Sequence, residues 1–329
     1  MRFLPALLVI SLSPLSALAE EPVKNLRLGL IGLDTSHVIA FTSRFNDPDN
    51  PNHVPGATVI AAFKGGSPDI PSSISRVPGY TKTLTEKYGV KIYNDIATMC
   101  HDVDAVLLTS LDGRPHLAQA RPVIAAGKPL FIDKPVAGSV KDAVEIFQLA
   151  RRAEVPCFSS SSLRWYPGVV QVATADVGEL RSAISYGPAP SEPHHPSLFW
   201  YGIHPTESLF TVLGPGCERV VATETENTIV VTGKWANGRI GTLQGIRGGK
   251  TGYKVTAFGT KAIVEQKSGG DYTPMLREIV TFFRTGTPPV KPELTLEIYA
   301  FMEAADESIR QGGKPISIPD YLRKNGWRK

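Results

Sequence analysis

Between Leu26 and about Arg152, short apolar runs alternate with stretches of helical periodicity. Runs such as "LRLGLIGL", "ATVIAAF", "VDAVLLTS" and "KPLFID" predict strands, and "SHVIAFTSRFND", "TKTLTEKYG", "PHLAQARPVIAAG" and "SVKDAVEIFQLARRA" predict helices between them. Such alternation predicts a mostly parallel sheet with helices on both faces, and right-handed crossovers make it doubly wound. The fold class is therefore α/β, with a Rossmann-like domain at residues 24–152.

The pattern changes after Val155. "PCFSSS" predicts one more strand and "LRWYPGVVQVAT" a helix, and Gly- and Thr-rich runs with strand alternation follow. These runs predict a second α/β domain at residues 153–329, built on an open, largely antiparallel sheet. Two helices, "PMLREIVTFFRTG" and "TLEIYAFMEAADESIRQGG", are expected to close the chain and to pack back on the first domain. The stretches 47–56 and 65–79 are rich in Pro, Gly, Ser and Asn and are expected to be irregular.

The first residues, "MRFLPALLVISLSPLSALAEE", have one Arg, an apolar run and then "ALA" before Glu20. This is the layout of a secretory signal peptide at residues 1–19, with cleavage after Ala19. The alternative is an uncleaved membrane anchor, but Pro5, Ser11, Ser13 and Pro14 break the run, and spanning takes about 20 apolar residues. We therefore expect an exported protein, periplasmic or extracellular, with no membrane span in the mature chain.

Composition narrows the function classes. The 329 residues carry a formal net charge of +4 with no dense basic run, so nothing indicates nucleic-acid binding. Cys100, Cys157 and Cys217 have no CxxC spacing and are interpreted as buried small hydrophobic residues, although one pair could form. His194, His195 and His204 are candidate metal ligands, but no Cys or carboxylate is clearly arranged with them, so no metal is predicted.

The first predicted strand leads into a partial dinucleotide fingerprint. A Rossmann fingerprint has glycine at three positions. When Gly32 is taken as the first, the second position is Asp34 and the third is His37. An acidic side chain repels a diphosphate, although Asp34 could instead cap the helix. Thr35, Ser36 and the helix N-terminus could still bind an anion. Taken alone, the fingerprint indicates a cofactor only weakly.

Two further positions bear on the cofactor. The acidic residue expected after the second strand is missing, and Lys64-Gly65-Gly66-Ser67 stands there, which suits either a 2′-phosphate or a solvated loop. In "GKPLFIDKPVA", Lys134 lies between an acid and a proline at a strand's end, where ligands bind in such folds. A lysine there can bond a substrate hydroxyl or exchange its proton, and the alternative is a surface lysine in a turn.

With these residues stated, the chain resembles the glucose–fructose oxidoreductase, inositol dehydrogenase and MocA-like family. That family carries a Glu-Lys-Pro signature, here Asp133-Lys134-Pro135. The run "DVDAVLLTSLDGRPHLAQARPVIAAGKPLFIDKPVA", which includes His116, is similar to the family's course from the fourth strand to the signature. "RWYP" and "YGIHPTESLFTVLG" are similar to its Arg-x-x-Pro segment and its substrate-domain helix, which opens with a His.

The resemblance implies roles for particular residues. In the family the signature Lys, an Asp and a His four residues later manage a hydroxyl proton while nicotinamide takes hydride from the same carbon. Lys134 and His204 match, but the Asp position is Trp200, which puts the usual acid–base relay in doubt. His204 could act alone, and Glu207, one turn later, could bind substrate hydroxyls.

Other residues are predicted to contact substrate or cofactor. Arg164 anchors substrate or forms a structural ion pair. Phe199, Trp200 and Tyr201 stack on a sugar ring or form a hydrophobic plug. The expected sets are catalytic Lys134 and His204; substrate-binding Arg164, Trp200, Tyr201 and Glu207; and cofactor-binding Gly32, Asp34, Thr35, Ser36, His37, Lys64, Ser110, His116 and Asp133.

The leading hypothesis is an NAD- or NADP-dependent oxidoreductase that acts on a hydroxyl of a carbohydrate or polyol in a cleft between the domains. Two alternatives stay open: a non-redox carbohydrate enzyme (a lyase or hydrolase) and a sugar-binding protein that has lost ordinary cofactor use. Asp34, His37 and Trp200 favour these alternatives. By analogy with the family, a homo-oligomer is also plausible.

Overall fold

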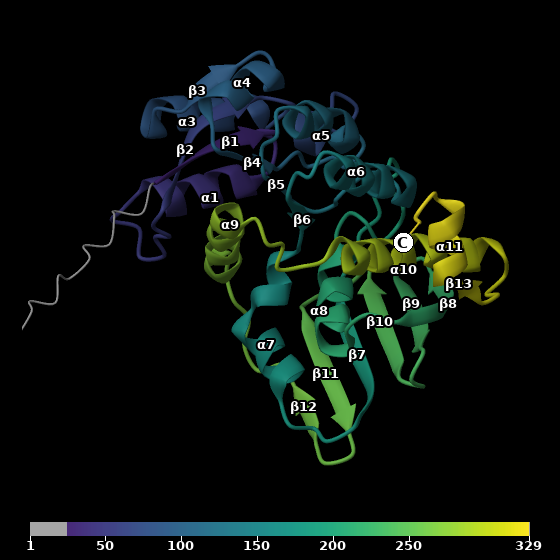
Figure 1. Cartoon of the computed structure of the whole chain (residues 1–329). Helices are drawn as coiled ribbons and strands as arrows, with labels where there is room; N and C mark the ends of the chain where they lie inside the picture. The colour runs from purple at the N-terminus through teal and green to yellow at the C-terminus, as the bar shows by residue number, and fades with distance from the viewer. Residues whose placement is uncertain (1–24, 329) are drawn as a thin grey trace, which may run out of the picture.

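The computed structural model describes residues 25–328, and the expected signal peptide lies outside them. Two sheets form the frame, one carried by the first half of the chain and one by the second (Figure 1). The first is parallel and the second mostly antiparallel, so the predicted α/β class is confirmed.

The first sheet has six strands in the order β3-β2-β1-β4-β5-β6. The chain order reverses between β1 and β4, and ligands bind at such a switch point, outside the carboxyl ends of the strands. The strands are β1 (Leu26–Ile31), β2 (Ala57–Phe63), β3 (Lys91–Tyr93), β4 (Ala105–Leu108), β5 (Leu130–Ile132) and β6 (Cys157–Ser159). Strand β6 lies beyond residue 152, so the sheet continues past the domain boundary expected from sequence.

Helices cover both faces of this sheet. Leu30 packs in one apolar cluster with α1 (Ser36–Asn46) and α3 (Val77–Tyr88), and Ile31 packs in another with α4 (Ile96–Asp102), α5 (His116–Ala125) and α6 (Val140–Arg152). All four residues of β4 are buried, as expected of a central parallel strand. Helix α3 ends at Gly89, whose φ of 65° is the left-handed conformation that glycine adopts readily.

The second sheet has seven strands in the order β12-β11-β7-β10-β9-β8-β13, and only β7 and β10 pair in parallel. Its burial alternates along the strands, because one face packs on helices. The strands are β7 (Leu180–Pro188), β8 (Cys217–Thr225), β9 (Thr228–Trp235), β10 (Ile240–Ile246), β11 (Lys254–Gly259), β12 (Ile263–Glu265) and β13 (Ile316–Ser317).

The remaining helices join the two halves. Helix α8 (Ile203–Leu213) packs on the second sheet, and α10 (Pro292–Arg310) contacts β8 as well as α6 of the first domain. Helix α9 (Thr273–Thr285) shares an apolar cluster with β1 and α1. The segment η1 (Ser162–Trp165) and α7 (Pro167–Thr174) follow β6, so the one helix expected there is two elements divided before Pro167.

Three sequence expectations need correction. The 65–79 stretch is not wholly irregular, because it contains α2 (Pro71–Ile74) and the start of α3. The sequence analysis missed α4, whose Asp95 caps the helix by accepting a hydrogen bond from the Thr98 N–H. It also missed α11 (Ile318–Lys324), which follows the two helices expected to close the chain.

The cysteines and the helices bear on two other expectations. Cys100, Cys157 and Cys217 are buried and unpaired. Within residues 25–328, every helix is too short or too polar to cross a bilayer.

Candidate functional site

The signature turn begins directly after β5. Asp133 is almost fully buried, and its Oδ1 accepts a hydrogen bond from the Lys134 N–H at 2.8 Å. Its Oδ2 contacts His37 Nδ1 at the start of α1. Burial alone would raise the pKa of Asp133, but the neighbouring His37 and Lys134 outweigh burial and hold it below its usual value. His37 and the signature acid therefore form a pair that links the ends of β1 and β5.

Lys134 points toward the second domain. Its Nζ lies 5.1 Å from the centre of the Tyr201 ring, and only 8% of the residue is exposed. Burial lowers the pKa of Lys134, helped by the charge of Arg76 and opposed by Asp133. A lysine with a lowered pKa exchanges its proton more readily near neutral pH, as general acid–base catalysis requires.

His204 also contacts Tyr201. The two rings are 5.9 Å apart, and Ser161 Oγ is 2.7 Å from His204 Nδ1, which fixes the imidazole orientation. The pKa of His204 is well below its ordinary value because of burial and the nearby charges of Lys134 and His37. Lys134 and His204 thus both lie against Tyr201.

Arg164 and Glu207 form an ion pair with each other. Arg164 Nε lies 2.5 Å from Glu207 Oε1, and both side chains are largely buried. Ser160 Oγ, which accepts from Trp165 Nε1, donates to the same carboxylate at 3.4 Å. Arg164 Nη2 is buried with no hydrogen-bond partner among residues 25–328. The structure therefore favours the ion pair considered for Arg164, with one guanidinium nitrogen left over.

The three adjacent aromatic residues have different surroundings. Phe199 is fully buried against Tyr299, with 4.9 Å between ring centres, as in the predicted plug. Trp200 packs on His195 at 5.2 Å. Tyr201 is 39% exposed and covers Lys134, so it is the member of the three that is placed to stack on a sugar.

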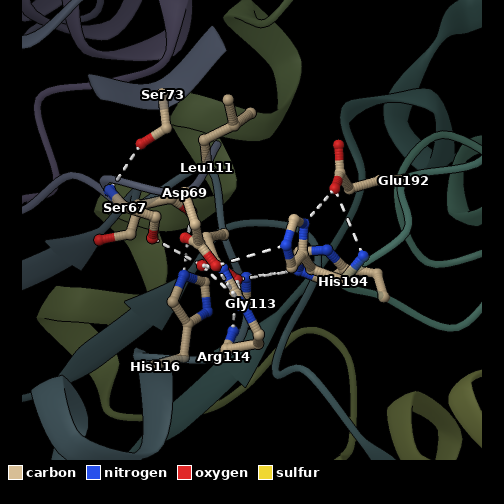
Figure 2. Close-up of polar contacts among 12 residues, drawn as sticks. Ser67, Asp69, Ser73, Leu111, Gly113, Arg114, His116, Glu192 and His194 are labelled. Atoms are coloured by element: carbon tan, nitrogen blue, oxygen red, sulfur yellow. Dashed lines mark hydrogen bonds and ion pairs between the residues drawn. The ribbon is translucent and has the colours of Figure 1, made fainter. Parts of the chain in front are cut away.

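His194 and His195 belong to a polar network around Asp112 and Asp69 (Figure 2). His195 Nε2 lies 3.0 Å from Asp112 Oδ1, and Arg114 contacts both Asp112 and Asp69. Burial raises the pKa of Asp112, but the bonds from His195, Arg114 and Ser67 outweigh it and hold the pKa far below its usual value. In the described part of the chain, no cluster of three or more His, Cys, Asp or Glu residues suits a metal.

Most residues expected at the cofactor line the turn after β1. Gly32 has a φ of 89°, and a Cβ there would come within 2.4 Å of the Ser110 backbone, so only glycine fits. Thr35 caps α1 by accepting from the His37 N–H at 3.4 Å, while Ser36 and Lys64 are exposed. Between them, Asp34 is fully buried.

Asp34 decides how well these residues suit a dinucleotide. Its carboxylate accepts hydrogen bonds from the Leu111 N–H and from Ser73 Oγ, at 3.0 and 2.6 Å. Burial raises its pKa, opposed by those two bonds. A diphosphate needs donors and room at this position, but the chain puts a buried acceptor there, so in this conformation the residues do not fit the cofactor's diphosphate.

His116 has a structural environment. It is fully buried, with Nε2 2.9 Å from the Ser110 carbonyl oxygen and Nδ1 3.2 Å from that of Val136. His116 therefore joins the loop after β4 to the signature turn, and both of its ring nitrogens are taken up by these two contacts. Ser110 is likewise buried, and its Oγ donates to Gln119.

Two tyrosines that the sequence did not predict lie near these residues. Tyr253 lies 5.9 Å from the His204 ring and Tyr272 lies 4.8 Å from the His37 ring, measured between ring centres. Both come from late segments with no motif that links them to the signature. A cavity of about 960 Å³ lies elsewhere, between β8, α10 and α11, and contains none of the predicted site residues.

Several solved structures are similar to this fold. A "probable dehydrogenase" from Thermotoga maritima has a TM-score of 0.74 at 18% identity, covering 90% of this chain and 100% of that one. The apo scyllo-inositol dehydrogenase of Lactobacillus casei has a TM-score of 0.75 at 14% identity, with 91% and 100% covered. GenD2 from gentamicin A biosynthesis, solved with NAD, has a TM-score of 0.73 at 17% identity, with 93% and 99% covered. These TM-scores show a shared fold.

Family membership was compared separately. No curated protein matches the sequence. The model of an oxidoreductase family with an NAD-binding Rossmann fold matches residues 69–161, which include the signature turn. That description names NAD as the cofactor that the family's Rossmann fold binds. The resemblance drawn from the sequence is therefore confirmed, and residues 69–161 are the part of the chain that matches the model of the Gfo/Idh/MocA oxidoreductase family.

Proposed function

We propose that the protein is an NAD- or NADP-dependent oxidoreductase that acts on a hydroxyl group of a carbohydrate or polyol. The observation that carries the proposal is the meeting of Lys134, Tyr201 and His204 beside the signature turn. The matched oxidoreductase family supports the reaction class. Similarity to an inositol dehydrogenase supports a polyhydroxylated substrate.

The chain's own groups suit the handling of a hydroxyl proton. The lowered pKa of Lys134 leaves its amine able to release and accept a proton, and the lowered pKa of His204 keeps the imidazole neutral at neutral pH. Tyr201 offers an aromatic face over the same lysine. In the proposed complex, Lys134 exchanges the proton of the reacting hydroxyl, His204 orients that hydroxyl and Tyr201 packs on the ring.

A non-redox carbohydrate enzyme, or a sugar-binding protein, is the second candidate. The observation that favours it is Asp34, whose buried carboxylate stands where a diphosphate would bind. The two candidates differ in their need for a dinucleotide, so one experiment separates them.

The test is calorimetric titration of the purified protein with NADH and NADPH, followed by turnover assays with NAD⁺ and NADP⁺ on a panel of sugars, polyols and sugar acids. The proposal expects saturable binding of one dinucleotide and its reduction by at least one compound. Absence of dinucleotide binding at millimolar concentration, together with binding of a sugar, would establish the second candidate instead.

We also propose that the protein is exported, on the basis of the apolar run and "ALA" before Glu20. Expression of the full chain in a bacterium tests this by fractionation and N-terminal sequencing. Export predicts a mature protein outside the cytoplasm that starts at Glu20, and an intact N-terminus in the cytoplasm would contradict it.

A further inference from the structure

One buried carboxylate ties together three segments at the end of the first sheet. Asp34 follows β1, Leu111 follows β4 and Ser73 lies in α2, between β2 and α3. Asp34 Oδ1 accepts from the Leu111 N–H at 3.0 Å, and Oδ2 accepts from Ser73 Oγ at 2.6 Å. Both carboxylate oxygens are therefore engaged within the chain.

The segment that carries Ser73 is held down by further bonds, some of them visible in Figure 2. Ser73 Oγ also accepts from the Ser67 N–H at 2.8 Å, and Ser67 Oγ donates to Asp112 at 2.6 Å. Arg114 donates to both carboxylate oxygens of Asp69 at 2.8 Å. Residues 64–76, called here the covering segment, thus lie fastened over the carboxyl ends of β1 and β4.

The covering segment also touches the glycine turn directly. The Leu33 N–H donates to the Lys64 carbonyl at 2.7 Å. A Cβ added to Gly65 would lie 3.1 Å from the Gly32 Cα, so the two backbones are in contact. In a dinucleotide-binding Rossmann fold, the ribose held after the second strand and the diphosphate held at the glycine turn occupy this region.

The second glycine position of the fingerprint, here Asp34, explains why the space for a diphosphate is closed. The family fingerprint uses glycine in second place so that the backbone can approach the diphosphate. Here that place is Asp34, whose buried side chain stands where the glycine would be and bonds to Leu111 and Ser73. His37, in third place, is similarly occupied by Asp133. Asp34 and His37, the two residues that depart from the fingerprint, are therefore both held by contacts within the chain.

We propose that Asp34 controls dinucleotide access: its bridge to Ser73 and Leu111 keeps the diphosphate path closed, and a dinucleotide binds only when the covering segment is released. This inference rests on the proposed function. Apparent affinity falls in proportion to the fraction of molecules that are open, so breaking the bridge raises affinity without adding any contact to the cofactor.

The experiment compares NADH binding by calorimetry across the wild type and three variants. Asp34→Gly removes the bridge and the charge, and we expect at least tenfold tighter binding. Ser73→Ala breaks one arm and keeps the carboxylate, and we expect about threefold tighter binding, since a partly released segment opens more often. Ser72→Ala, an exposed neighbour in α2, is the matched control and should bind like the wild type.

Hydrogen exchange supplies a readout that is independent of affinity. Asp34→Gly and Ser73→Ala should speed amide exchange in residues 66–76, and NADH should speed it in the wild type. Wild-type binding that neither variant improves, with exchange unchanged, overturns the control by Asp34 and leaves the proposed function standing. Absence of binding by every folded protein, at millimolar NADH, overturns both. If Asp34→Gly does not fold, Ser73→Ala decides by the same criteria.

Discussion

At the dinucleotide end of the site, both carboxylate oxygens of Asp34 are bonded within the chain. At the substrate end, Arg164 Nη2 is buried with no hydrogen-bond partner in the described residues, and Tyr201 is 39% exposed above Lys134. Polar groups left unbonded inside a protein are costly unless a ligand completes them. The comparison shows an unbonded guanidinium nitrogen and an exposed aromatic face at the substrate end, whereas both carboxylate oxygens of Asp34 are already bonded within the chain.

The largest expected effect concerns the lysine at the substrate end. Lys134→Ala should lower turnover of the compound found in the panel by about 10²–10⁴-fold, since general acid–base groups contribute that much. Steady-state kinetics of the folded variant measure it, and Lys250→Ala, an exposed lysine, is the control. Activity within a few-fold of the wild type would make Lys134 structural and remove the contrast between the two ends.

The largest effect on the free energy of unfolding is expected at the ion pair between Arg164 and Glu207. Glu207→Ala leaves Arg164 charged and unpaired in a buried place, and we expect a loss of about 3–5 kcal/mol in the free energy of unfolding. Urea denaturation measures this loss. The double variant Arg164→Met with Glu207→Leu should lose less than Glu207→Ala, because it leaves no buried charge. Equal losses would show that the pair is worth no more than its packing.

Stability should depend on pH through His204. Its folded-state pKa lies below the unfolded value of about 6.5, so the unfolded chain binds the extra proton first. The associated stability is complete above about pH 6.5 and is lost as pH falls toward the folded pKa, with a slope of at most about 1.4 kcal/mol per pH unit. His204→Asn should make the free energy of unfolding less pH-dependent between about pH 6.5 and 5. An unchanged slope would mean that His204 protonates as easily in the folded protein.

The smallest effect concerns the aromatic face. Tyr201→Ala should weaken sugar binding by about 0.5–1.5 kcal/mol, and Tyr201→Phe should retain most of it, since the ring supplies the contact. Calorimetry with the compound identified in the panel measures both variants. If Tyr201→Ala binds as tightly as the wild type, the sugar contacts the site elsewhere.

Much of the frame was predictable because local patterns determine it. The buried runs of β1, β2 and β4 and the periodic helices between them predicted the parallel sheet, and the Asp133-Lys134-Pro135 turn placed Lys134 at its carboxyl edge. Elements with weak patterns were missed: α2 has only four residues, in a stretch rich in Pro and Ser, and α4 has seven. Helix α2 is held by a tertiary bond between Ser73 and Asp34, which no local pattern predicts.

The sequence predicted which residues belong to the site better than it predicted what each of them contacts. Lys134 and His204, which the family resemblance singled out, both contact Tyr201, which was predicted separately as an aromatic residue that stacks on a sugar or forms a plug. Sequence could not show that Glu207 is taken by Arg164, or that Tyr253 and Tyr272 approach from segments far along the chain. Asp34 was recognised as a poor diphosphate neighbour, but its bonding to α2 required a structure.

The most direct test of this account is a crystal structure of the wild-type protein grown with saturating NADH. The account predicts a dinucleotide at the carboxyl ends of β1 and β4, with Ser73 Oγ withdrawn from Asp34 and the nicotinamide beside Lys134. A dinucleotide bound while the Asp34–Ser73–Leu111 bridge is intact, or a structure without one despite saturation, would contradict it.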